Sequence, residues 1–467
     1  MSASAAASSS KKPFNAAEAT QWLNNRFRAI EAEALNPSLP PEARPEILKV
    51  PKQAGAGSTN AGGTGVWGGS KTSSSRTRHP DHADTKMSTE PIQAQAAPSG
   101  SSIPAPENGS HVTEDEAALY DRQIRLWGLE AQNRMRQAHI LVYNLGGVAT
   151  ETIKNIVLSG VGSLSILDNA EVSWSDLGAG FFFREEDVGK KRVDAALPRI
   201  QALNPLVKIH ALHQTTLLDD VEQLRALKLS AIVATRGSRA ELIRWNDHAR
   251  ALSLLFYAAG PQGFSGWIFA DLGPVHSYLF GKSELVTTKD ARTGESKTES
   301  IKKKVRREQE FIELGKVLDL SWKSWPPKKV SRLKLRSAGM WVAWSAWQLE
   351  ETSTDPSQLY TAANITSTAA ALQQTVLSLA ADKGVDPTSF LNRSDAETST
   401  YFQQYCLARS VPGEFAPTAA ILGGILAQDL LNALGGREEP LCNWFQYDGS
   451  TGAGLTHRLG VEEAKTV

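Results

Sequence analysis

The pattern of apolar and polar positions predicts regular structure in the later three quarters of the chain. A short, mostly apolar run covers residues 139–145. Gly146 and Gly147 follow it, and apolar positions then recur at helical spacing. A second apolar run, LSILD, ends at Asp168. This succession predicts a βαβ unit over residues 139–168, the opening of a doubly wound sheet.

Further apolar runs extend the pattern toward the C-terminus. They alternate with several helical patterns, which predicts the α/β class. The additional strand candidates cover residues 208–213, 230–235, 252–259 and 266–272. A final helix is predicted over Ala416–Leu434 because a Gly-Gly pair ends it, and a closing strand is expected in residues 443–449.

Composition divides the chain into segments. Residues 1–112 are predicted to be a largely disordered extension, since Gly, Ser, Thr, Pro and Ala crowd residues 52–111, with a short helix possible at 16–34. A capping box at Thr113–Glu116 opens the ordered part. The predicted order is then the first part of the sheet domain (113–281), a charged loop (282–310), a mostly helical insertion (311–410), the rest of the sheet domain (411–460) and a tail (461–467).

The overall charge excludes some classes of partner. The chain has 50 Lys+Arg and 50 Asp+Glu, so no global field draws it to nucleic acid or to an anionic membrane. No apolar run approaches the roughly 18 to 20 residues that span a bilayer. The basic run Lys302–Arg307 is typical either of a nuclear address or of a solvated helix start. We therefore expect no nucleic-acid or membrane partner, and a location in the nucleus and also in the cytoplasm.

Two cysteines and a group of tryptophans are predicted to be structural. Cys406 lies in an apolar helical stretch without a neighbouring histidine, and Cys442 precedes an aromatic strand. Buried, unreactive thiols fit this setting better than a catalytic thiolate or a disulfide, and a reducing compartment fits the low count. Trp341, Trp344 and Trp347 recur at helical spacing, which predicts packing in a core or against a partner.

The loop after the first predicted strand is an incomplete nucleotide motif. It reads Asn144-Leu-Gly-Gly-Val-Ala149 and does not match GxGxxG in any register. Asp168 stands 21 residues after Gly147, where an acidic residue can reach a ribose hydroxyl, but also where an ordinary cap can stand. Nucleotide binding and plain core architecture both remain open, whereas an NAD-dependent oxidoreductase would need glycines that are missing here.

Several longer stretches resemble one family. They are YDRQIRLWGLEAQ (120–132), VGKKRVDAALPRIQALNP (188–205) and APTAAILGGILAQDLLNALGG (416–436), the last followed by NWFQYDG. Together they resemble the ThiF/MoeB-like adenylation family and, within it, the small subunits of SUMO-activating enzymes, over about residues 113–460. The resemblance implies a Rossmann-like, doubly wound, mostly parallel sheet with a small helical insertion. It also implies that two related domains dimerise and that one of them chiefly binds ATP.

Departures from the family pattern imply that this chain is the degenerate half. Active halves have glycines where Asn144 and Ala149 stand, and Asp-x-Asp where this chain has Asp168-Asn-Ala. Their Asn-Leu-Asn-Arg-Gln run is replaced by residues 176–180 (Asp-Leu-Gly-Ala-Gly), and a magnesium-binding Asp by residues 235–237 (Thr-Arg-Gly). The resemblance therefore implies that ATP and magnesium are bound by the partner subunit, that this chain binds no metal, and that it is inactive alone.

One arginine is implied to retain a role in chemistry. Arg122 matches the family's arginine that reaches across the dimer into the partner's ATP site, where a guanidinium stabilises charge on the transferred phosphoryl group. Arg125, one helical turn later, is expected to form a structural salt bridge.

The implied function is that of a non-catalytic subunit supporting adenylation and thioester transfer of SUMO by a catalytic partner that carries the reactive cysteine. SUMO and its conjugating enzyme would be reached through that complex. Two alternatives stay open. One is the equivalent subunit for a Rub-type modifier, and the other is a nucleotide-independent dimerisation scaffold.

Overall fold

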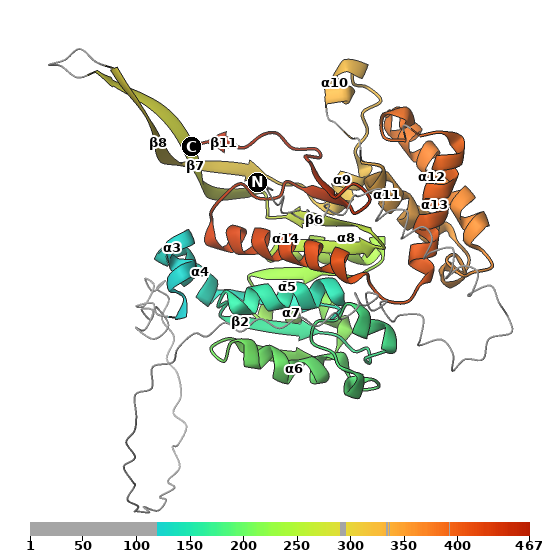
Figure 1. Cartoon of the computed structure of the whole chain (residues 1–467), viewed down its shortest axis with the longest axis horizontal. Coiled ribbons are helices and arrows are strands. Elements are labelled where there is room, and N and C mark those ends of the chain that lie inside the picture. Colours follow the sequence, from blue (N-terminus) through green and yellow to red (C-terminus); the bar gives the residue numbers. More distant parts are fainter. Residues whose placement is uncertain (1–118, 290–295, 333–334, 336, 392) are drawn as a thin grey trace, which may run out of the picture. The chain divides into compact units, whose positions relative to one another are not determined.

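An eight-stranded sheet runs through the centre of the protein (Figure 1), in the strand order β10-β9-β6-β5-β4-β1-β2-β3. The computed structural model describes residues 119–289, 296–332, 335, 337–391 and 393–467. The short helix predicted at 16–34, the linker and the Thr113–Glu116 capping box lie outside the described residues.

The first half of the sheet is parallel. β1 pairs with β2 and β4, β2 pairs with β3, and β4 pairs with β5, all in parallel. The central strands are continuous apolar runs because helices cover both of their faces. All five strands lie where the sequence predicts them. They are β1 (His139–Tyr143), β2 (Ser163–Leu167), β3 (Lys208–Leu212), β4 (Ala231–Ala234) and β5 (Leu255–Gln262).

The second half of the sheet is antiparallel. It consists of β6 (Ser265–Asp271), β9 (Trp444–Asp448) and β10 (Ala453–His457), in which each strand runs against its neighbour. β6 and β9 confirm predictions. β10 was not predicted, because its sequence AGLTH contains a glycine and its first four residues are exposed, so that no apolar alternation marks it.

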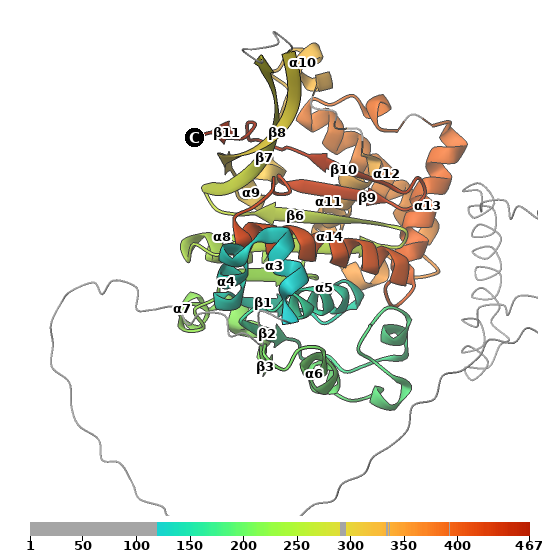
Figure 2. The ribbon, with the colours of Figure 1, turned by 60° about the vertical axis from the view of Figure 1, so that its left-hand side comes forward.

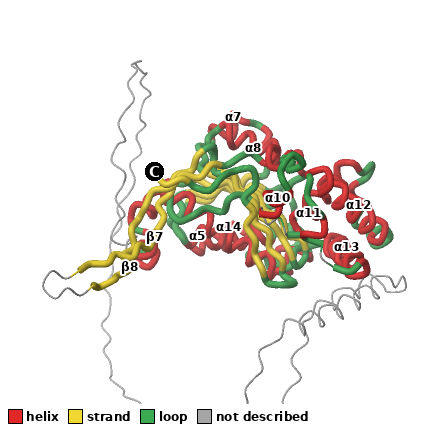
Figure 3. The backbone as a smooth tube through the Cα atoms, turned by 90° about the horizontal axis from the view of Figure 1, so that it is seen from above, coloured by secondary structure: helices red, strands yellow, loops and turns green. Residues whose placement is uncertain are grey.

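Helices pack on both faces of the sheet, so the residues that the structure describes form two hydrophobic cores. Seen from above in Figure 3, α7 and α8 lie on one side of the strands and α5 and α14 on the other. One core is built by α4 (Leu129–Gln137), α5 (Gly147–Leu158), α6 (Arg192–Leu203) and α14 (Ala416–Gly435). The other is built by α7 (Val221–Ala226), α8 (Arg239–Ala251) and the helical insertion, which begins with α9 (Leu314–Asp319).

Helix α14 is more apolar than the sequence analysis assumed. Its 20 residues have a mean hydropathy of 1.3, enough by length and composition for a membrane span. The expectation that no run approaches this length was therefore wrong. The stretch was not recognised because Gln428, Asp429 and Asn432 interrupt its apolar residues. More than half of the helix is buried against α5 and β6, the ordinary position of a core helix.

The insertion between the two sheet halves is mostly helical, as predicted for residues 311–410. It contains α9, α10 (Pro327–Arg332), α11 (Ala338–Thr352), α12 (Ile365–Lys383) and α13 (Asp395–Ser410). Trp341, Trp344 and Trp347 of α11 are buried and pack with Trp267 of β6 and Trp444 of β9. We call these five residues the tryptophan cluster. The predicted core role of the α11 tryptophans is confirmed, and the cluster joins the insertion to the sheet.

A long hairpin replaces the predicted charged loop. β7 (Val275–Lys289) and β8 (Ser296–Glu310) pair in antiparallel fashion, and Figure 1 shows them reaching away from the main sheet. The loop prediction for 282–310 was therefore wrong. The helix start considered for Lys302–Arg307 was also wrong, since this run lies in β8. The sequence of β8 consists mostly of charged and polar residues without an apolar alternation, so it looks like a loop. The predicted tail contains β11 (Lys465–Thr466), which pairs with β8.

Candidate functional site

The crevice of interest lies where the order of the parallel strands reverses, between β1 and β4. Ligands of doubly wound sheets bind at such a point, beyond the carboxyl ends of the strands. A cavity of about 670 Å³ opens there. Asn144 follows β1 and Thr235 follows β4, and the Asn144 Nδ2 donates to Thr235 Oγ1 at 3.2 Å. Thr235 Oγ1 in turn donates to the Asn144 carbonyl at 2.8 Å, so the two loops that frame the crevice are tied together.

The N-terminus of α5 forms the floor of this crevice and is already capped. Its N-cap residue, Gly146, has no side chain to bind the first backbone N–H groups. Glu414, from the segment before α14, supplies the cap, and the Val148 N–H donates to its Oε2 at 2.8 Å. Burial raises the pKa of the Glu414 carboxyl, although hydrogen bonds from the Val148 and Gly147 N–H groups oppose this. Ala149, at one of the expected glycine positions, is fully buried in the core.

The two glycines of the loop are required by this carboxylate. A Cβ atom at Gly146 would collide with Glu414 Oε1, and one at Gly147 would lie 2.9 Å from Glu414 Oε2. Real Cβ atoms essentially never come this close to an oxygen. The remaining glycines of the incomplete motif therefore make room for Glu414.

Asp176 of the crevice and the neighbouring Asp168 are also engaged within the protein. Asp168 is buried and accepts hydrogen bonds from the N–H groups of Leu145 and Ala170, both at 2.7 Å. Asp176 accepts from Arg192 Nη2 at 2.7 Å, and the Arg192 Nη1 lies 3.4 Å from Asp168. A single guanidinium thus balances both carboxylates. Asp168, the sequence candidate for a ribose contact, acts here as a cap for two loops.

The crevice has few of the free groups that a nucleotide triphosphate with its metal ion requires. Such a group needs free N–H donors, unpaired cations and metal-binding carboxylates in fixed positions. Here Glu414 holds the donors of α5 and the Arg192 charge is balanced by Asp168 and Asp176. Within the described ranges, no three His, Cys, Asp or Glu side chains come together as a metal-ligand set.

Sequence reasoning missed Glu414 and Arg192. Glu414 lies 266 residues from its hydrogen-bond partner Val148, and Arg192 lies 24 residues from Asp168. Neither belongs to an apolar period or to a nucleotide motif. An acid directly before the final helix and an arginine in the stretch 188–205 were the only signals, and neither has a spacing that indicates its partner.

A second site residue, Arg122, is carried by a helix that is fixed at both ends. This helix is α3 (Asp121–Trp127), and none of its residues is buried. Figure 2 shows it in front of the sheet, beside α4. The preceding Tyr120 is buried, and Asn204 Nδ2 donates to its hydroxyl at 2.7 Å. At the other end, the Trp127 indole N–H donates to Gln132 Oε1 at 2.8 Å. Anchors on both sides hold α3 on the body of the protein.

The two arginines of α3 differ in their contacts. Arg125 Nε lies 3.0 Å from Asp121 Oδ1, so the predicted structural salt bridge is confirmed. Arg122 is exposed, and in the described part of the chain its guanidinium has no ion-pair partner. The structure thus places Arg122 on the surface rather than near Asn144, Gly147 or Asp168.

Both cysteines are buried. Cys406 is inaccessible and Cys442 nearly so, and burial raises the pKa of each thiol to about 12. Arg409 near Cys406 and Arg458 near Cys442 oppose this rise, but burial outweighs them, so neither thiol has the lowered pKa of a catalytic cysteine. The prediction that these thiols are buried is confirmed.

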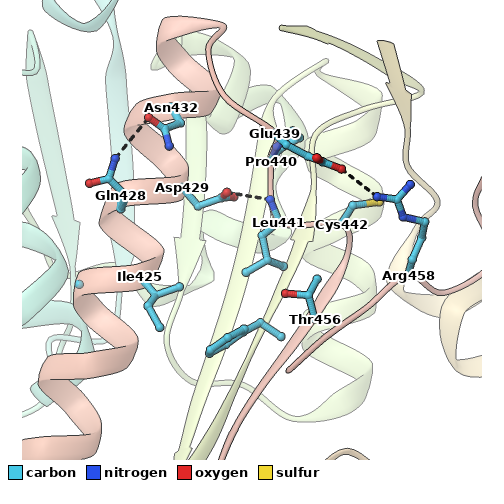
Figure 4. A pocket seen from close by; sticks show the side chains of 12 residues that line it. Ile425, Gln428, Asp429, Asn432, Glu439, Pro440, Leu441, Cys442, Thr456 and Arg458 are labelled. Atoms are coloured by element: carbon cyan, nitrogen blue, oxygen red, sulfur yellow. Dashed lines mark hydrogen bonds and ion pairs between the residues drawn. The ribbon is translucent and has the colours of Figure 1, made fainter. Parts of the chain in front are cut away.

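A further hollow beside α14 contains a buried carboxyl group. Figure 4 shows Asp429 directed toward Leu441, whose backbone N–H donates to Oδ1 at 2.7 Å. The Tyr257 hydroxyl donates to Oδ2 at 2.7 Å. Burial raises the pKa of Asp429 to about 6, although both hydrogen bonds oppose this. The contacts link α14, β5 and the segment before β9, which is a structural role.

The raised pKa predicts a pH dependence of stability. Between pH 4 and 6 folded Asp429 holds a proton that the unfolded chain has lost, so its contribution to stability falls as pH rises through about 6. Compared with Asp429→Asn, the wild-type chain should lose on the order of 2 to 3 kcal/mol between about pH 4 and pH 7. Urea unfolding across this range measures the difference. The exposed Asp382→Asn should show the wild-type pH dependence, and an identical slope for Asp429→Asn would contradict the assignment.

Comparison with known proteins places these features in one group. Residues 120–466 match the sequence model of the ThiF family. The chain is 31% identical over 383 residues to the human protein named "SUMO-activating enzyme subunit 1", covering 76% of this chain and 98% of that protein. The rat protein of the same name is 32% identical over 380 residues, covering 75% and 96%. The Saccharomyces cerevisiae "DNA damage tolerance protein RHC31" is 35% identical over 361 residues, covering 73% and 96%.

Proposed function

The chain belongs to the ThiF family, and on this premise we propose that it is the non-catalytic subunit of a heterodimeric SUMO-activating enzyme. The matched proteins named as subunit 1 of that enzyme are covered almost completely, which supports a shared role in SUMO activation. Their names also favour SUMO over a Rub-type modifier. The word "subunit" in those names supports an assembly with a second chain.

The state of the crevice is the observation that carries the proposal. Its helix N-terminus is bound by Glu414, and its two aspartates share Arg192. A chain with such a site needs another subunit to bind ATP and magnesium. The partner subunit would therefore hold the nucleotide and form the adenylate, and this chain would be inactive alone.

Arg122 is the residue through which this chain would act on the reaction. In the adenylation step the modifier's C-terminal carboxylate attacks the α-phosphorus of ATP, and pyrophosphate leaves. Negative charge then grows on the phosphoryl oxygens, and a guanidinium supplied from a neighbouring subunit stabilises it. An exposed arginine on a helix fixed by Tyr120 and Trp127 is suited to this role, because its backbone is already positioned.

The thioester step is assigned to the partner. A reactive thiol must be ionised and accessible, and Cys406 and Cys442 are neither. The same partner would carry the catalytic cysteine and pass the modifier to its conjugating enzyme. We extend the proposal to a nuclear location for the assembly.

Capture of the full-length chain from its own cells tests the proposal. We expect it to bring down one activating-enzyme subunit in equal amount, together with SUMO bound to that subunit through a thioester. A chain with both Cys406→Ala and Cys442→Ala should support the same thioester level. Recovery of a Rub-type subunit and its modifier would mean that the chain supports activation of that modifier instead of SUMO. Recovery of the chain without a second subunit would contradict the heterodimer.

A further inference from the structure

The Glu414 carboxylate lies where a doubly wound fold ordinarily binds a phosphate. In such folds, backbone N–H groups at the start of the first helix point at the ligand and the helix dipole favours negative charge. In this chain the corresponding helix is α5, and its Val148 N–H donates to Glu414 Oε2 at 2.8 Å. The Gly147 N–H contributes a second hydrogen bond to the same carboxylate. A carboxylate therefore makes the contacts that a phosphate oxygen would make.

The packing around the loop fits this occupancy. A Cβ atom at Gly146 or Gly147 would meet the two oxygens of Glu414, so both glycines lie directly against the carboxylate. A Cβ atom at Gly147 would also lie 2.8 Å from the Ala179 methyl, so Ala179 packs directly against the same glycine. A phosphate could enter only if the Glu414 side chain moved away.

The segment that carries Glu414 is fixed on both sides. Gly413 has a φ of +102°, and a Cβ atom there would lie 2.8 Å from the Ser175 carbonyl oxygen, so this residue brings the segment close to the loop before Asp176. On the other side, the Phe415 ring packs edge-on against Phe264 with centroids 4.5 Å apart. These two anchors direct the intervening Glu414 toward α5.

We propose that Glu414 is an internal phosphate mimic that keeps the nucleotide cradle of this chain closed. Nucleotide is then excluded by an occupied site as well as by the missing family residues. The inference does not depend on which modifier the assembly activates. It predicts that removal of one side chain reopens an anion site at the N-terminus of α5.

Titration calorimetry of the full-length chain with inorganic pyrophosphate tests the proposal. The wild-type chain should show no detectable binding of pyrophosphate. Glu414→Ala should bind pyrophosphate with a dissociation constant at least about tenfold below the weakest one that the titration detects, because charge-assisted contacts become available. Absence of any gain in a folded Glu414→Ala chain would overturn the proposal. Binding of pyrophosphate by the wild-type chain at the same site would also overturn it.

Two matched variants separate occupancy from charge. Glu414→Gln keeps the shape of the side chain and an oxygen that can accept from the α5 N–H groups, so it should remain closed to pyrophosphate. Glu350→Gln removes a carboxylate from the same cavity without touching α5, since Glu350 accepts from Tyr360 and Arg409. It should give no gain either. If either variant bound pyrophosphate as tightly as Glu414→Ala, the negative charge of the cavity would be what excludes the anion. That result would contradict the proposal that Glu414 mimics a phosphate.

A second measurement decides the matter if Glu414→Ala does not fold. Amide hydrogen exchange of residues 146–149 is followed in the wild-type chain with and without pyrophosphate. A closed cradle predicts that pyrophosphate leaves the exchange of these amides unchanged. Added protection at Gly147 and Val148 would show that the anion displaces Glu414, and would contradict the proposal.

Discussion

Replacement of Arg122 by alanine is expected to slow SUMO-dependent ATP–pyrophosphate exchange by the heterodimer at least about tenfold, while the heterodimer stays intact. The reason is that the adenylation transition state would lose a guanidinium that reaches it from the neighbouring subunit. The folded structure should hardly change, because Arg122 is exposed and α3 is held by Tyr120 and Trp127. Exchange kinetics together with size-exclusion chromatography measure both outcomes.

Arg125→Ala is the matched control for this experiment. Arg125 lies on the same helix, is exposed and pairs with Asp121 at 3.0 Å, so its loss should change the exchange rate by less than about twofold. Arg122→Lys should recover only part of the rate, since an ammonium cannot make bidentate hydrogen bonds. If Arg122→Ala heterodimers exchanged at the wild-type rate, the chain would be a dimerisation scaffold instead.

Replacement of Trp444 by alanine should lower the free energy of unfolding by about 3 to 5 kcal/mol. Trp444 is fully buried and its ring stacks on Trp267 at 5.0 Å between centroids, with Trp344 and Trp347 packed edge-on at 5.7 and 6.1 Å. Alanine would leave a large void at the joint between the sheet and the helical insertion. Urea unfolding followed by circular dichroism gives the change directly.

Trp444→Phe shows whether ring packing or the indole N–H matters. The Trp444 Nε1 has no hydrogen-bond partner among the described residues, so phenylalanine removes ring area without breaking a hydrogen bond. We expect it to lower the free energy of unfolding by less than about 2 kcal/mol. A loss equal to that of Trp444→Ala would show that the cluster does not depend on an aromatic ring at this position.

The order of the main sheet was predictable because buried strands and helices leave strong periods. Apolar runs mark β1, β2 and β4 as fully covered strands, and the Gly-Gly pair at 435–436 marks the end of α14, whose C-cap residue Gly436 has a φ of +62°. The β7–β8 hairpin was missed for the opposite reason. The β8 sequence consists mostly of charged and polar residues and shows no apolar alternation, so nothing in it separates the strand from a charged loop.

The candidate site was only partly predictable. The loop Asn144–Ala149 and Asp168 do meet, because the carboxyl ends of parallel strands share one edge of the sheet, and the Leu145 N–H donates to Asp168. The role of Asp168 as an internal cap depends on hydrogen bonds that the sequence does not specify. Glu414 and Arg192 reach this crevice only through tertiary folding. The contacts that Glu414 and Arg192 make there can be read from the folded structure and not from residue spacing.

The measurement that bears most directly on the central claim is ATP–pyrophosphate exchange by the purified full-length chain, with and without a catalytic SUMO-activating subunit. With SUMO and magnesium ATP present, the isolated chain should show no exchange above background, and addition of the partner should restore it. Exchange by the isolated chain would show that it forms the adenylate unaided, and would contradict a chain that acts only by completing another subunit's site.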